Sequence, residues 1–206
     1  MADISKLMQV IGKGQGIALS SNYRVKFTGS NIARYLTTGD ISQDSIELLC
    51  DEAQLPNVQT TTAQHAGKYM GQGPILYPHT RIYTDLTLGF ISTSDMNQLK
   101  FFTNWFDNIF GGKDVTSVSS SQINSSATQR NQTYRLSFPV NYTAEIRITK
   151  DELGPTDAGR PSITYILEQA YPYSIDSVPL SYGTSQTAKV TVNFHYAKHS
   201  VLYIEN

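Results

Sequence analysis

The feature that most constrains this chain is a strict alternation of apolar and polar residues near its C-terminal end. Even positions between Ala188 and Tyr196 are apolar or aromatic, whereas the odd positions are polar: Lys189, Thr191, Asn193 and His195. Successive side chains of a β-strand point to opposite faces of its sheet, so this period of two predicts a strand with one buried face. The same alternation predicts strands elsewhere: Tyr23–Thr28, Arg81–Ile91 and, with a bend at Pro139 that divides it into two strands, Tyr134–Ile148.

Shorter apolar runs predict further strands, and turn residues predict where the chain leaves the sheet. The additional strands are expected at Ile46–Cys50, Ser162–Gln169 and Val201–Ile204. Between Asp51 and Gly73, Leu55-Pro56, three consecutive threonines and two glycine-containing turns favour an extended loop or an excursion at a sheet edge.

One segment has a helical period instead. Apolar residues recur at steps of three and four between Met96 and Phe110, which gives one apolar helical face with Trp105 at its margin. An N-cap is expected within Thr93–Asp95, because a side-chain oxygen there can accept from unpaired amides of the first turn. Gly111-Gly112 is expected to end the helix.

These patterns predict a mainly β fold, namely an antiparallel β-sandwich or barrel of about six or seven strands with one amphipathic α-helix flanking it. A length of 206 residues fits a single domain covering residues 1–206. Residues 1–20 are expected to form an N-terminal arm able to dock on another subunit, and residues 111–132, almost wholly polar or small, a flexible loop.

The charge balance excludes some classes of function. With 16 Lys and Arg against 17 Asp and Glu, the chain has a formal charge of −1, so an electrostatic nucleic-acid binder is not expected. A single cysteine, Cys50, can form no internal disulfide and no closed thiolate zinc site. No apolar run reaches the roughly 20 residues of a membrane helix, so no membrane contact is expected.

The candidates for catalytic or ligand chemistry are weak. Gly12–Gly16 lacks the spacing of either phosphate-binding glycine motif. His195 and His199 would lie about 13 Å apart on a strand, too far to share an ion. The acid pairs Asp51-Glu52 and Asp151-Glu152 are adjacent, so their side chains diverge on an extended chain. We therefore expect no catalytic residues, no metal, no cofactor and no enzymatic activity.

The tyrosine-rich segment Tyr165–Tyr182 leaves one alternative open. Amphipathic aromatic rings can stack on sugars, so a carbohydrate-binding module is a second class of function for this chain. Tyrosine enrichment is equally typical of protein interfaces. A carbohydrate-binding module would be monomeric and would bind sugars measurably.

Several motifs, taken in their order, resemble the tail tube and baseplate tube proteins of contractile-tailed bacteriophages. The resemblance spans roughly residues 20 to 197. The motifs that carry it are Leu49-Cys50-Asp51-Glu52-Ala53-Gln54-Leu55-Pro56, Thr60-Thr61-Thr62, Gly71-Gln72-Gly73-Pro74-Ile75, Asp85–Ile91, Phe101–Phe106, Ala170–Ile175 and Ala188–Tyr196.

The resemblance implies a structural virion protein, most simply the major tail tube subunit. Such subunits form hexameric rings whose sheets join into an inner β-barrel, and the stacked rings conduct DNA out of the capsid. It also implies a sheath protein outside, a tape-measure protein and passing DNA in the lumen, baseplate tube proteins at one end, and assembly in the host cytoplasm. A baseplate tube protein that initiates the tube is the alternative within the family, and the type VI secretion tube protein is similar in architecture.

Four residues are predicted to make inter-subunit contacts. Leu55 and Pro56 would place an extended segment after the second strand, and Tyr171 and Pro172 would redirect the chain between two strands. Packing of turns within one chain is the alternative explanation for all four.

Overall fold

Nine strands and five helices occur in the described part of the computed structural model, which covers residues 4–13, 17–36, 42–65, 71, 73–110, 136–152, 162–180, 182–183 and 187–204. The strands are β1 (Tyr23–Thr28), β2 (Cys50–Ala53), β3 (Val58–His65), β4 (Ile75–Tyr83), β5 (Leu86–Ile91), β6 (Ala144–Asp151), β7 (Ser162–Ile175), β8 (Lys189–His195) and β9 (Lys198–Ile204). The helices are α1 (Ile4–Lys13), α2 (Ile32–Tyr35), α3 (Gln43–Leu48), α4 (Asn97–Ile109) and α5 (Pro139–Tyr142).

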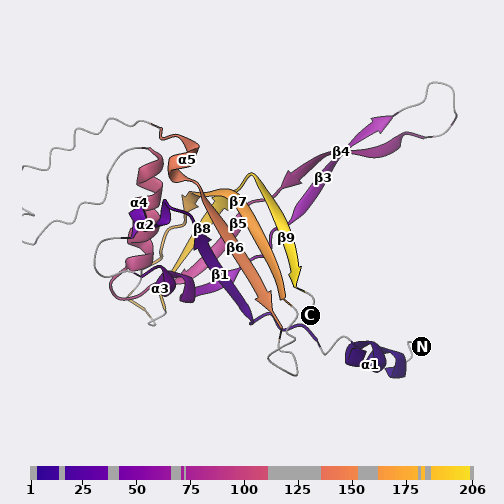
Figure 1. Ribbon diagram of the computed structural model, residues 1–206, viewed down its shortest axis with the longest axis horizontal. Coiled ribbons are helices and arrows are strands. Elements are labelled where there is room, and N and C mark those ends of the chain that lie inside the picture. The colour runs from indigo at the N-terminus through magenta and orange to yellow at the C-terminus, as the bar shows by residue number, and fades with distance from the viewer. Residues whose placement is uncertain are drawn as a thin grey trace, which may run out of the picture.

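Six strands form one antiparallel path in the order β1-β6-β7-β8-β5-β2, and β9, the seventh strand, pairs with β7. The 14-residue strand β7 belongs to two sheets. Its first half pairs with β6 and β9, and its second half pairs with β8. We call β1-β6-β7-β9 sheet A and β7-β8-β5-β2 sheet B. The remaining strands, β3 and β4, form a separate hairpin that projects from the body (Figure 1).

The hydrophobic core lies between the two sheets. Phe27 of sheet A lies with its ring centroid 6.3 Å from those of both Phe90 and Phe194 in sheet B. Helix α4 covers one end of this core (Figure 1), where Phe102 packs 4.8 Å from Phe90 and the indole of Trp105 stands edge-on to Phe27. The Trp105 indole donates to the carbonyl of Tyr142 at 2.7 Å, which satisfies its only polar group.

The predicted fold class is confirmed, with the sheet open rather than closed into a barrel. The terminal strands β1 and β2 of the path are not hydrogen-bonded to each other as strands. Instead, the Tyr23 hydroxyl donates to the carbonyl of Cys50 at 3.1 Å and joins the two sides of the opening.

Several local predictions are wrong. Residues 43–48 form helix α3, so the strand expected at Ile46–Cys50 starts only at Cys50. Residues 139–142 form helix α5 because proline is well suited to the first turn of a helix, so Pro139 starts a helix where a bend between two strands was expected. The single strand expected over Arg81–Ile91 is interrupted after Tyr83. Of the two alternatives for the segment after Asp51, an excursion at a sheet edge fits better than a loop, because β2 is the last strand of the path and β3 belongs to the separate hairpin.

The amphipathic helix is confirmed, but its expected cap is not. The N-cap is Met96, in the left-handed conformation with φ 53° and without a side-chain capping bond. Gln98 ties the start of the helix to the preceding segment, because its Oε1 accepts from the backbone N–H of Thr93 at 3.2 Å. The expected stop at Gly111-Gly112 and the polar loop over residues 111–132 lie outside the described residues. No helix among the described residues has the length and apolarity needed to cross a membrane.

Candidate assembly surface

Sheet A ends in two strands that each have only one neighbour among the described strands. Strand β1 pairs with β6 alone, and β9 pairs with β7 alone. The outer edge of such a strand presents unpaired backbone N–H and C=O groups, which can pair with a strand of another chain. Sheet A can therefore be extended at both sides.

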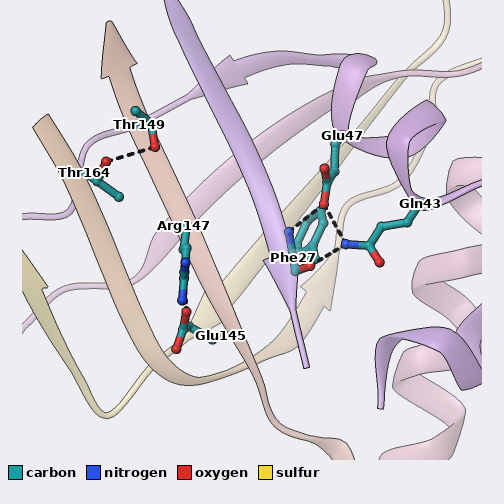
Figure 2. Close-up of polar contacts among 7 residues, drawn as sticks. All are labelled: Phe27, Gln43, Glu47, Glu145, Arg147, Thr149 and Thr164. Carbon is teal, nitrogen blue, oxygen red and sulfur yellow. Dashed lines mark hydrogen bonds and ion pairs between the residues drawn. The ribbon is translucent and has the colours of Figure 1, made fainter. Parts of the chain in front are cut away.

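Part of the β1 edge is already filled by helix α3, as Figure 2 shows. The backbone N–H of Phe27 donates to Oε1 of Glu47 at 2.8 Å, and Nε2 of Gln43 donates to the carbonyl of Phe27. The same Gln43 nitrogen also donates to Glu47 at 2.8 Å. These two side chains take the place of a neighbouring strand at Phe27, so backbone pairing to another chain stops there.

A groove of about 400 Å³ continues along β1 beyond Phe27. It is lined by Tyr23, Arg24, Val25, Lys26, Asp44, Glu47, Leu48 and Cys50. Because backbone groups alternate in direction along a strand, those of Val25 and Tyr23 point to the same side as those of Phe27. Burial raises the pKa of both the Tyr23 hydroxyl and the Cys50 thiol to about 12, so neither ionises near neutral pH.

Most charges on the face of sheet A that points away from the core are paired with one another, and exposed Lys26, opposite Arg147, adds one further positive charge. Arg147 lies 2.5 Å from Glu145, and the hydroxyls of Thr149 and Thr164 are 3.0 Å apart (Figure 2). The other pairs are Arg24 with Asp151 at 2.8 Å and Lys198 with Glu168 at 3.1 Å. Exposed pairs of this kind add little stability, but they cancel charge locally.

The β3–β4 hairpin carries an exposed apolar surface. Four of its large apolar side chains are exposed, namely Ile75, Leu76, Tyr77 and Ile82. Its base is held by Tyr83, whose ring lies 5.1 Å from that of His199 in β9 and 5.9 Å from Tyr196. Burial, and then the charge of Arg81, lowers the pKa of His199. The rest of the hairpin is free to meet another molecule.

The four predicted contact residues lie in two different parts of the fold. Leu55 and Pro56 are in the connection between β2 and β3, where Leu55 is exposed. Tyr171 and Pro172 lie inside β7, where its pairing passes from sheet A to sheet B, so they do not connect two strands as expected. Pro172 is buried, and the Tyr171 ring packs against Tyr142 and His195. Their contact with another subunit stays a prediction.

The weak chemical candidates are used in contacts within the chain. Nδ1 of His195 lies 2.5 Å from Oδ1 of Asp85, and the Tyr173 ring stacks on the His195 ring at 3.9 Å. Asp51 pairs with Lys189, while His199 lies in the separate aromatic cluster at the hairpin base. No group of three or more His, Cys, Asp or Glu side chains suited to a metal ion occurs in the part of the chain that the structure describes.

The sequence pattern predicts a strand at residues 46–50 and no helix before it, so it does not identify Gln43 and Glu47. A usable signal precedes them: Ser42 is an N-cap whose Oγ accepts from the backbone N–H of Ser45 at 3.2 Å. Asp44 in the first turn adds a second helix-start signal. Which strand edge the helix would fill could not be inferred from that signal.

A sequence-family comparison shows to which family the chain belongs. The model of the phage tail tube protein family matches residues 18–202, nearly the whole chain. The chain belongs to the phage tail tube protein family. It is a structural subunit of a phage tail tube and thus a component of the virion tail. No curated protein matches its sequence.

Solved structures show the same fold for this tail tube protein. A chain in the structure of the anti-feeding prophage cap matches with a TM-score of 0.57 and 11% identity, over 92% of this chain and 93% of that chain. A protein of the sheath–tube complex of an extracellular contractile injection system matches with a TM-score of 0.55 and 12% identity. This match covers 91% of this chain and 93% of that chain. A protein from the anti-feeding prophage baseplate matches with a TM-score of 0.50 and 15% identity. This match covers 90% of this chain and 95% of that chain. At such identities the likeness supports the fold alone.

Proposed function

We propose that this tail tube protein is the major tail tube subunit and forms hexameric rings that stack into the DNA conduit of a contractile tail. The observation that carries the proposal is that sheet A is open at both β1 and β9. A baseplate tube protein would share this sheet, but it would form an initiating ring rather than long tubes. Membership of the family favours both interpretations over a carbohydrate-binding module.

The directions of the strands suit a closed ring. Each neighbouring pair in β1-β6-β7-β9 is antiparallel, so β1 and β9 run in opposite directions. A rotation about an axis along the strands keeps their directions, and it therefore brings β9 of one copy antiparallel to β1 of the next. Repeating this head-to-tail contact closes a ring and leaves no free edge of sheet A.

Such a ring would line its lumen with the polar face of sheet A. The opposite face carries the core, sheet B and α4, which must then lie toward the outside (Figure 1). The paired charges around Arg147, Arg24 and Lys198 leave little net positive charge to retain a polyanion. DNA and a tape-measure protein can then pass without sequence-specific binding.

The remaining parts of the proposal follow from the tube. The outer side would face a sheath protein, one end of the tube would meet baseplate tube proteins, and assembly would take place in the host cytoplasm. The subunit would have no enzymatic activity, cofactor or metal. Leu55, Pro56, Tyr171 and Pro172 remain proposed contact residues between subunits.

Electron microscopy and light scattering across a concentration series test the proposal. Six-fold rings that stack into long hollow tubes are expected, with or without a baseplate seed. Single rings that never extend would favour the baseplate tube protein. A species that stays monomeric even with a seed would overturn the proposal.

A variant tests the β1 edge itself. Leu48 lines the groove and is 84% exposed, so Leu48→Arg should leave the subunit folded but block the edge. Rings should be lost at concentrations where the wild type forms them. Leu180→Arg is the matched control, because Leu180 is 82% exposed and lies outside the groove. Normal rings from Leu48→Arg would show that β1 is not the ring contact.

A further inference from the structure

We propose that α1 of one ring docks on an apolar patch beside α5 in the next ring, so that these two surfaces form a ring-to-ring contact. The inference rests on the proposed ring, because it assigns the two surfaces to opposite faces of it. The patch consists of Phe110, Leu136, Phe138 and Val140 and is called the α5 patch below.

Helix α1 has an apolar face that nothing in the described structure covers. Ile4, Leu7, Met8 and Ile11 lie at helical spacing on one side, and Lys6 and Gln9 lie on the other. Ile4 is 74% exposed and Leu7 58% exposed. A helix of 10 residues has little stability alone, so it needs a surface to pack on.

The α5 patch is the complementary surface. Phe138 is 75% exposed and Val140 is 82% exposed, and Phe110 and Leu136 are exposed beside them. The segment is fixed in place, because the backbone N–H of Ser137 donates to the carbonyl of Ile109 at 2.8 Å. Asn31 Nδ2 also donates to the carbonyl of Val140 at 2.7 Å. An exposed apolar cluster held this firmly is typical of a protein contact.

These two surfaces lie beyond opposite ends of sheet A (Figure 1). Helix α5 directly precedes Ala144, at the end of the sheet where Thr28 pairs with Glu145. The segment after α1 is held at the other end, because the backbone N–H of Leu19 donates to Glu152 at 3.3 Å and that of Asp151 donates to the carbonyl of Asn22 at 3.0 Å.

A second copy is therefore the occupant that the arrangement favours. If the strands of sheet A run along the tube, α1 and the α5 patch lie on opposite faces of a ring. A contact between two different surfaces of identical subunits can be repeated from copy to copy. When the repeats do not close into a ring, the copies form an open stack. Between α1 and Leu19 the chain can span about 20 Å, which allows α1 to cross the junction between rings.

Cysteine cross-linking tests the contact directly. In a Cys50→Ser background, Leu7→Cys with Val140→Cys should give, in assembled tubes, oxidised products that link different copies into ladders. Gln9→Cys with Val140→Cys is the control from the polar face of α1 and should not cross-link. A cross-link within one chain, or no cross-link in intact tubes, would overturn the inference.

Assembly measurements separate this inference from the ring proposal. Leu7→Asp and Phe138→Asp should each raise the critical concentration for tube growth by at least about tenfold while single rings still form. Gln9→Asp should change it little. Normal tubes from Leu7→Asp would refute the docking of α1 and leave the ring proposal intact, whereas a wild type without rings would refute the ring proposal itself.

Discussion

Among the described residues, the two longest helices are both amphipathic, yet one is covered by its own chain and the other is not. In α4, Phe101, Phe102 and Trp105 are fully buried against the two sheets. In α1, Leu7, Met8 and Val10 are more than half exposed. The same period of apolar residues therefore marks an intramolecular core contact in one helix and an unpartnered surface in the other.

The difference shows what an apolar helical face alone can reveal. It indicates that a helix needs a partner, but not whether the partner is in the same chain. In a tube subunit both kinds are expected, because each copy must fold and must also bind its neighbours. The predictions below test whether α4 serves folding and α1 serves assembly.

The largest effect is expected for Trp105→Ala in α4. This change removes a fully buried ring that packs on Phe27 and Tyr35, and it also leaves the carbonyl of Tyr142 without its indole donor. The free energy of unfolding should fall by about 3–5 kcal/mol in urea denaturation of the monomer. A loss below about 1 kcal/mol would mean that α4 is not part of the folding core.

The sequence predicted α4 because its period and length agree, and it predicted β1 and β8 because alternation is local. A short apolar run predicted only the second part of β9, Val201–Ile204. The sequence could not predict α5, because the residues before Ala144 continue the alternation of a strand: Leu136, Phe138, Val140 and Tyr142. Packing decides there, since Trp105 and Asn31 bind carbonyls of the α5 segment. Such contacts join residues more than 30 positions apart, and no local pattern reports them.

A smaller effect is expected at α3, where polar side chains rather than apolar ones tie the helix to the sheet. Glu47→Ala removes the acceptor for the backbone N–H of Phe27 and for Gln43. The free energy of unfolding should fall by about 1–3 kcal/mol, because a half-buried donor is left unpaired. Asp44→Ala on the same helix is the matched control, since Asp44 is exposed. Equal losses in both variants would contradict this role for Glu47.

The candidate surface was predictable only in part. The family resemblance pointed to a tube whose sheets join between subunits, which implies that strand edges take part in assembly. Which edges are free depends on strand order: β1 pairs only with β6, and β9 pairs only with the first half of β7. The sequence predicts that Tyr171 and Pro172 redirect the chain between two strands, yet β7 continues through both residues.

The hairpin base extends the comparison to an element with both a packed and an exposed part. Burial and the charge of Arg81 lower the pKa of His199, while in the unfolded chain it should titrate near its ordinary value of about 6.5. The unfolded state therefore binds more protons as the pH falls below about 6.5, and stability is lost in that window until the folded pKa is passed. Well above pH 6.5, His199 is neutral in both the folded and the unfolded state.

His199→Gln should remove this contribution. The difference in unfolding free energy between pH 7.5 and pH 5 should be smaller in the variant than in the wild type, as measured by urea denaturation at both pH values. His65→Gln, at an exposed position of the hairpin, should leave the difference unchanged. An identical pH dependence in wild type and His199→Gln would show that the cluster does not resist protonation.

The smallest effect on folding is expected in α1, and it is the sharpest test of the comparison. Leu7→Asp should change the unfolding free energy of the monomer by no more than about 0.5 kcal/mol, because the side chain is exposed there. Leu99→Asp makes the same substitution in α4, where Leu99 packs against the core, and it should be strongly destabilising. Urea denaturation below the assembly concentration compares them. If Leu7→Asp cost more than about 1 kcal/mol there, α1 would have to pack on its own chain in solution, and both helices would then serve folding. If only the assembled tube responds to Leu7→Asp, the apolar face of α1 is a surface for a neighbouring copy.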